Sequence, residues 1–156
     1  MNTPSSRPQA DSGIFWPIRV YYEDTDAAGI VFYANYLKYF ERARTEWLRA
    51  CGVEQSRLER ESGIFFVVRR TTVDYLAPAR LDDMLTVESR VERLRGASVD
   101  FMQQLRCGDR VLASGAINVA CLERLTFRPV ALPPEVVAAL REGPRPMSAG
   151  LSAASA

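Results

Sequence analysis

Two aspartates and a glycine stand just ahead of the longest helix-competent run in the sequence, within the segment YYEDTDAAGIVFYANY (residues 21–36). Asp24 and Asp26 are of a type that forms turns and caps helices, and Gly29 permits backbone angles that a Cβ would resist. The first N–H groups of the following helix have no partners within that helix. We therefore expect a carboxylate to lie near free donors, beside a glycine that leaves room for a substrate. This is the minimum equipment for attack on a carbonyl, with the carboxylate as base or nucleophile and the N–H groups stabilising the oxyanion.

The residue types that the chain lacks narrow this chemistry. The sequence contains no histidine and a single lysine, Lys38. Ser-His-Asp and Cys-His mechanisms and histidine-ligated metals are excluded, so a general base must be a carboxylate, the lysine, a tyrosine or a cysteine, and the carboxylates are favoured. Cys51, Cys107 and Cys121 show no CxxC spacing, which predicts reduced, mostly buried thiols rather than disulfides or a zinc site. We expect no metal and no cofactor.

The composition is that of one globular domain of 156 residues. A net charge of +1 gives no electrostatic reason for a nucleic-acid partner. No apolar run reaches the length of a membrane-spanning helix, and residues 1–12 lack the apolar core of a signal peptide, which predicts a cytoplasmic protein. We expect a disordered leader at 1–12, a domain over 13–141 and a disordered tail at 142–156.

The apolar periodicity changes along the domain and predicts an α+β arrangement. Residues 14–22 alternate as a strand should, whereas apolar residues recur at helical spacing from about Ala34 to Cys51. We expect the later elements to be four antiparallel strands joined by tight turns, with the long helix lying in the curve of the sheet. Strand patterns occupy 65–76, 85–91, 99–107 and 111–122, and short helices are expected at 54–61 and 133–141.

Three segments together closely resemble the hotdog-fold acyl-CoA thioesterases: YYEDTDAAGIVFYANYLKYFERAR (21–44), VVRRTTVDYLAPARLDD (67–83) and LRGASVDF (94–101). The likeness covers roughly residues 14–140. The nearest branch resembles the YbgC-type enzymes associated with the Tol-Pal cell-envelope system, and the 4-hydroxybenzoyl-CoA thioesterases are close relatives. The resemblance implies an antiparallel sheet of five to six strands wrapped around one central helix. It also implies hydrolysis of an acyl-CoA thioester to a free acid and coenzyme A.

The same resemblance implies roles for individual residues. The family's catalytic carboxylate falls on Asp26, and its oxyanion donor is the backbone N–H of the residue at position 33, here Tyr33. Gly29 is implied to line the thioester site. The turn that contains Arg95 and Ser98 resembles the segment that contacts the coenzyme A phosphates.

One departure concerns position 33, where many YbgC-type members carry histidine and this chain carries tyrosine, as the hydroxybenzoyl-CoA branch does. A role for the backbone N–H would be preserved, whereas a role for a histidine side chain would be lost. The resemblance further implies a homodimer with two sites at its interface, often assembled into a homotetramer. The substrate carrier is coenzyme A or, as an alternative, acyl carrier protein.

Several residues and functions have competing interpretations. Asp26 could simply cap the helix or a turn, and Asp24 is expected to be structural. Glu41 and Glu46 offer a second carboxylate, but we expect Glu41 to pair with Arg42, Arg44 or a strand residue. The alternative functions are a non-catalytic acyl-CoA or acyl-carrier-protein binding module of envelope assembly, and a hotdog dehydratase or hydratase. The last typically relies on a histidine, which this chain lacks.

Overall fold

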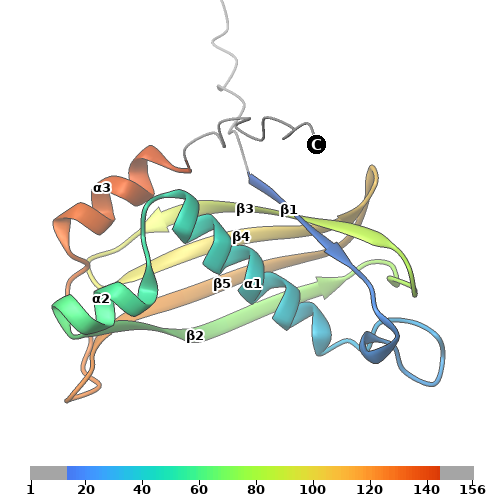
Figure 1. Cartoon of the computed structure of the whole chain (residues 1–156), viewed down its shortest axis with the longest axis horizontal. Coiled ribbons are helices and arrows are strands. Elements are labelled where there is room, and N and C mark those ends of the chain that lie inside the picture. Colours follow the sequence, from blue (N-terminus) through green and yellow to red (C-terminus); the bar gives the residue numbers. More distant parts are fainter. Residues whose placement is uncertain (1–13, 145–156) are drawn as a thin grey trace, which may run out of the picture.

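A computed structural model describes residues 14–144, which form one antiparallel five-stranded sheet with helices packed on one side (Figure 1). The sheet order is β1-β3-β4-β5-β2. The predicted leader and most of the predicted tail lie outside the described residues. The strands are β1 (Ile14–Arg19), β2 (Ile64–Tyr75), β3 (Met84–Leu94), β4 (Ser98–Cys107) and β5 (Arg110–Glu123), and the helices are α1 (Asn35–Ala50), α2 (Gln55–Ser62), α3 (Pro134–Glu142) and a 3-10 turn at Tyr22–Asp24.

The predicted elements are all present, but one predicted connection is wrong. Tight turns join β3 to β4 and β4 to β5, whereas β2 does not pair with β3. It pairs with β5 at the opposite edge of the sheet, so residues 76–83 carry the chain across to β3. This crossing segment is held beneath the start of α1, because the Val31 N–H donates to the Ala79 carbonyl at 2.8 Å and the Ala79 N–H donates to the buried Tyr36 hydroxyl at 3.1 Å.

Helix α1 lies in the curve of the sheet, as its broad apolar stripe predicts (Figure 1). Its buried face consists of Tyr36, Tyr39, Phe40, Ala43, Arg44, Trp47 and Leu48. The Phe40 ring packs over Gly115 of β5, where an added Cβ would lie 3.2 Å from Cε2 of Phe40 and 3.1 Å from Cδ1 of Ile117. A side chain at position 115 would therefore push against the helix.

A buried polar cluster ties α1 to the two central strands. Gln103 of β4, which is fully buried, accepts a hydrogen bond from Arg44 Nη1 at 3.0 Å. Its amide nitrogen donates to the carbonyl of Phe40 at 2.9 Å and to the hydroxyl of Ser89 at 2.8 Å. Burial lowers the pKa of Arg44. Satisfied polar groups of this kind allow one arrangement of helix and sheet, because any slip would leave a buried group without its partner.

No helix within residues 14–144 is both long and apolar enough to cross a membrane.

Candidate active site

A short loop between residues 25 and 31 carries the predicted catalytic aspartate. Thr25 and Val31 form an antiparallel bridge, and within it the Asp26 N–H donates to the Ile30 carbonyl at 2.9 Å. The Gly29 N–H returns to the Asp26 carbonyl at 3.0 Å, with Gly29 at φ +73°. A side chain is disfavoured at this φ, although a Cβ there would meet no atom within 4 Å. Gly29 is therefore required by the shape of the loop.

The Asp26 side chain is exposed, and one of its oxygens holds the loop together. Oδ1 accepts a hydrogen bond from the Ala28 N–H at 2.8 Å, which is the local turn expected of this residue type. Across residues 14–144, Oδ2 accepts no hydrogen bond. The turn-forming interpretation and the catalytic one are thus compatible, because a single carboxylate offers one oxygen to the backbone and the other to solvent.

Asp24 is structural, as expected. Its carboxylate accepts from the Tyr21 N–H at 2.9 Å, and its carbonyl accepts from the Phe32 N–H and from the Asn35 side-chain amide, both at 2.9 Å. These bonds attach the acidic loop to the first residue of α1.

Burial and the neighbouring Asp24 carboxylate raise the pKa of the Tyr39 hydroxyl, which keeps that buried group neutral.

The amino end of α1 presents unused donors. Ala34 is the N-cap and supplies no side-chain cap, so the end of this helix relies on the backbone. Neither the Tyr33 N–H nor the Ala34 N–H makes a hydrogen bond to any residue between 14 and 144. Such donors at the positive end of a helix attract an anion or a developing oxyanion. The role of oxyanion donor that the resemblance implies for the Tyr33 N–H stays a prediction, and this N–H is free to donate within the described residues.

Tyr75, a residue that the sequence reasoning missed, holds Tyr33 from the other side. Its hydroxyl donates to the Tyr33 carbonyl at 3.1 Å, and its ring packs edge-on against those of Tyr33 and Tyr36, at 6.1 and 5.2 Å between ring centroids. Desolvation raises the pKa of the Tyr75 hydroxyl and keeps it a donor. Its place in the motif VVRRTTVDYLAP was the available signal, but only the fold brings the end of β2 to the start of α1.

Arg95 and Ser98 lie together, but away from the aspartate loop. Both line a cavity of about 530 Å³, and consecutive arginines Arg69 and Arg70 of β2 line it too. Arg95 Nε forms an ion pair with Asp100 at 3.2 Å, while Ser98 is buried. The sequence analysis named only Arg95 and Ser98 for the coenzyme A phosphates, so the gathering of three arginines is a feature that it missed.

The cavity lies against the middle of β2, where Arg69, Arg70 and Thr72 line it, whereas the aspartate loop lies at the end of that strand, beside Tyr75. Ser98 lies farther back, because it is opposite Ala120, which is opposite Val67. Val67 and Tyr75 are separated by about 26 Å along an extended strand. Within one subunit, therefore, the structure brings Asp26, Gly29 and Tyr33 together and leaves Arg95 and Ser98 apart from them.

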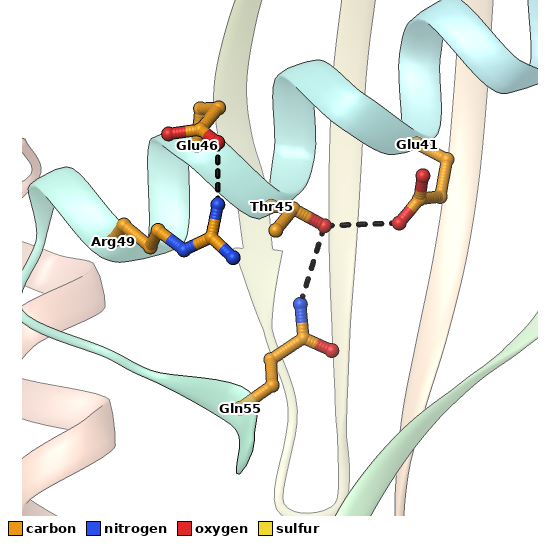
Figure 2. Close-up of polar contacts among 5 residues, drawn as sticks. All are labelled: Glu41, Thr45, Glu46, Arg49 and Gln55. Carbon is orange, nitrogen blue, oxygen red and sulfur yellow. Dashed lines mark hydrogen bonds and ion pairs between the residues drawn. The ribbon is translucent and has the colours of Figure 1, made fainter. Parts of the chain in front are cut away.

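The second pair of carboxylates takes no part in this loop. Figure 2 shows that Glu41 accepts from the Thr45 hydroxyl, at 3.0 Å, and that Gln55 reaches the same hydroxyl at 3.4 Å. Glu46 forms an ion pair with Arg49. The expected pairing of Glu41 with Arg42, Arg44 or a strand residue is wrong, because a hydroxyl one helical turn away is the nearer partner. Across residues 14–144, no three His, Cys, Asp or Glu side chains are grouped to hold a metal ion.

A family model described as the thioesterase-like superfamily matches residues 20–140. The chain belongs to this superfamily. Among its relatives, the acyl-CoA thioesterase YbgC of Haemophilus influenzae is 46% identical over 129 residues, which cover 83% of this chain and 95% of that protein. The acyl-CoA thioester hydrolase YbgC of Escherichia coli O157:H7 is 45% identical over 128 residues, covering 81% of this chain and 95% of that protein.

Solved structures of thioesterases agree with the fold. The probable thioesterase from Bartonella henselae superimposes with a TM-score of 0.73 at 35% identity, over 78% of this chain and all of that one. The α+β hotdog prediction is therefore confirmed: a five-stranded antiparallel sheet curves around one long helix, as in this superfamily.

Proposed function

We propose that the protein hydrolyses an acyl-CoA thioester to a free carboxylic acid and coenzyme A, with Asp26 as base or nucleophile and the Tyr33 N–H as the oxyanion donor. The observation that carries this proposal is the unused Tyr33 N–H at the head of α1, attached through Asp24 to the loop that exposes the Asp26 carboxylate. The names of the relatives supply the substrate class, since the YbgC proteins are called acyl-CoA thioesterases or thioester hydrolases.

The reaction needs few groups. As a base, Asp26 takes a proton from water, the hydroxide oxygen bonds to the carbonyl carbon, and collapse of the tetrahedral intermediate breaks the C–S bond. As a nucleophile, Asp26 Oδ2 bonds to the carbonyl carbon directly, and water then cleaves the resulting anhydride. Coenzyme A leaves as a thiolate in either case, so no strong acid is required. The Tyr33 N–H stabilises the charge on the carbonyl oxygen, and losing one such donor commonly costs on the order of 100-fold in rate.

Tyrosine at position 33 is compatible with this role. The donor is a main-chain group, and the Tyr33 ring is largely exposed, resting on Phe32 at 4.9 Å and on Tyr75. Replacing the histidine that is common in the YbgC branch therefore preserves the N–H and changes the surface around it. That surface is aromatic and faces whatever acyl group the loop receives.

The cavity that Arg69, Arg70 and Arg95 line is our candidate for the coenzyme A phosphates. A homodimer would set this cavity between two aspartate loops. Within residues 14–144 the outer edge of β2 pairs with no strand, and Val68 and Tyr75 on that strand expose 45% and 46% of their surface. Antiparallel pairing of two such edges about a two-fold axis places Arg69 and Arg70, at the middle of β2, close to the axis and about equally far from the Asp26 loops of the two subunits.

The Asp26→Asn variant tests the proposal in a thiol-release assay across a panel of acyl-CoAs. Asparagine keeps an oxygen for the Ala28 N–H, so the loop is expected to stay folded while the rate falls by about 100-fold or more. Asp82→Asn, at an exposed turn aspartate, is the matched control and should retain wild-type activity. Near wild-type hydrolysis by Asp26→Asn would reject the assignment, and saturable acyl-CoA binding without thiol release would favour the non-catalytic module.

A further inference from the structure

The loop between β5 and α3 displays two large apolar side chains to solvent. Leu125 and Phe127 expose 87% and 67% of their surface, and Leu125 is the most exposed large hydrophobic residue within the described part of the chain. Arg124 and Arg128 flank them, both exposed. A single exposed leucine means little by itself, but two apolar side chains held at one loop tip between arginines call for a partner surface.

This 124–128 loop is fixed rather than loose. The Glu123 carboxylate accepts hydrogen bonds from the Leu125 N–H at 3.1 Å and from the Thr126 N–H at 2.8 Å, and the Phe127 N–H donates to the Glu123 carbonyl at 2.9 Å. Phe127 adopts φ +56°, a left-handed backbone that is uncommon for an aromatic residue. The chain thus accepts backbone strain to hold these side chains outward, and strain of this kind clusters at functional sites.

Within one subunit the 124–128 loop cannot reach the aspartate loop. The Arg124 N–H donates to the Gly63 carbonyl at 2.8 Å, and the Phe127 ring packs edge-on against Phe65 at 5.4 Å, both at the beginning of β2. The aspartate loop and Tyr33 lie at the end of β2, beside Tyr75. The twelve residues of β2 separate the two loops by about 36 Å. Figure 1 shows the same separation, with the 124–128 loop reaching past the free edge of β2 near α2.

Two-fold antiparallel pairing of β2 places the beginning of the strand in one subunit beside the end of the strand in its partner. When the whole strand pairs, Ile64 of one subunit lies opposite the partner's Tyr75, so the 124–128 loop arrives beside the partner's Tyr33. The charges are complementary in this arrangement. Glu23, Asp26 and Asp74 are exposed at the arriving end, and Arg128 flanks the apolar tip, while Arg124 forms an ion pair with Glu59 of its own subunit at 3.3 Å. A second copy of this chain is therefore the occupant that the loop fits.

We infer that each 124–128 loop closes over the Asp26 site of the partner subunit, with Leu125 and Phe127 covering the acyl group of the substrate. The inference rests on the proposed function. An apolar cover excludes bulk solvent from the site and leaves only the reacting water, and the hydrogen bond from the Tyr33 N–H strengthens because the local dielectric constant falls. The same cover favours apolar acyl groups over charged ones, so Leu125 and Phe127 act in specificity as well as in rate.

A crosslinking experiment tests the geometry without reference to catalysis. Phe32, beside Tyr33, and Phe127 are both replaced by cysteine in a Cys107→Ser background, where the remaining cysteines, Cys51 and Cys121, are buried. A short bis-maleimide should convert the Phe32→Cys, Phe127→Cys protein to covalent dimers on a denaturing gel. Either cysteine alone should give none, because identical positions lie far apart across the axis. Absence of the dimer band from the doubly substituted protein would overturn the inference.

A complementation experiment tests the chemistry in the same dimer. Leu125→Ser, Phe127→Ser homodimers should lose on the order of tenfold or more in kcat/KM for apolar acyl-CoAs. Phe15→Ser, at a phenylalanine that is 55% exposed on β1 at the other edge of the sheet, should lose nothing. The loop variant is then co-expressed with Asp26→Asn under two different tags, and the mixed dimer is isolated.

In the mixed dimer, one site combines Asp26 with an intact loop from the other subunit, so activity should return to roughly half that of wild type. If the loop served its own subunit, the one site with Asp26 would keep the defective loop and activity would be about half that of the loop variant, which would refute the inference. An absence of thiol release from the wild-type protein would instead reject the proposed function, and the crosslink would still decide the geometry.

Discussion

Replacing Gly29 with alanine separates the shape of the aspartate loop from the stability of the domain. The added methyl meets no atom within 4 Å, so the cost is one of backbone conformation alone. Holding an alanine at φ +73° costs about 1–2 kcal/mol. Part of that strain can be relieved if the loop rotates toward negative φ, which swings the Asp26 carboxylate away from the Tyr33 N–H. We therefore expect a loss of about 1 kcal/mol in the free energy of unfolding together with a fall in kcat/KM on the order of tenfold or more.

Gly52 provides the matched control for this variant. It lies at φ +83°, follows the last turn of α1, and leaves the same open space around an added Cβ, but it stands at the opposite end of α1 from Tyr33. Gly52→Ala should lose a similar free energy of unfolding, measured by urea denaturation, and keep its activity in the thiol-release assay. Equal losses of activity in the two variants would show that kcat/KM simply follows stability, and the role given to the loop would be wrong.

Two further predictions concern the elements that hold the site in place. Gln103→Ala removes three buried hydrogen bonds and leaves the Arg44 guanidinium without its acceptor, so urea denaturation should show a loss of about 3 kcal/mol, against about 0.5 kcal/mol or less for Gln104→Ala on the opposite face of β4. Asp100 has a pKa held below its usual value by the Asn118 amide and the Arg95 guanidinium, so its stabilising contribution is present above about pH 4 and is lost as the pH falls through the depressed pKa. The difference in unfolding free energy between wild type and Asp100→Asn should therefore shrink below about pH 4, and a difference that grows with acidity would contradict the assignment.

Local chemistry explains why the aspartate loop could be predicted from sequence. The residue types at Asp26 and Gly29 decide the turn by short-range bonding, and the period of the apolar residues decides where α1 runs. Gln103 could also be placed on the inward face of β4, because alternation along the strand puts it beside Phe101 and Leu105. Its partners Arg44 and Ser89 could not be named, since they lie on other elements.

Long-range pairing explains what could not be predicted. The position of β2 beside β5 depends on the path of residues 76–83 beneath α1, and no local pattern encodes that path. The arginine cluster depends on a further irregularity. Arg69 and Arg70 would face opposite sides of a regular strand, but the register between β2 and β5 shifts between Val68 and Arg70, and both then line one cavity. The period of the apolar residues shows which face of a strand is buried, whereas β-bulges and crossing connections depend on how the strands assemble.

The contact between Gly115 and Phe40 links the packing of the core to the position of the amino end of α1. Phe40 packs where the strand has no side chain, and Tyr33 precedes it by seven residues, just ahead of the N-cap Ala34 of the same helix. Any side chain at position 115 would push α1 away from the sheet at Phe40. The Tyr33 N–H would then change its position relative to the Asp26 carboxylate. Mutations deep in the core can therefore change the turnover rate without touching a residue of the reaction, and selection on catalysis will constrain the packing beneath the helix.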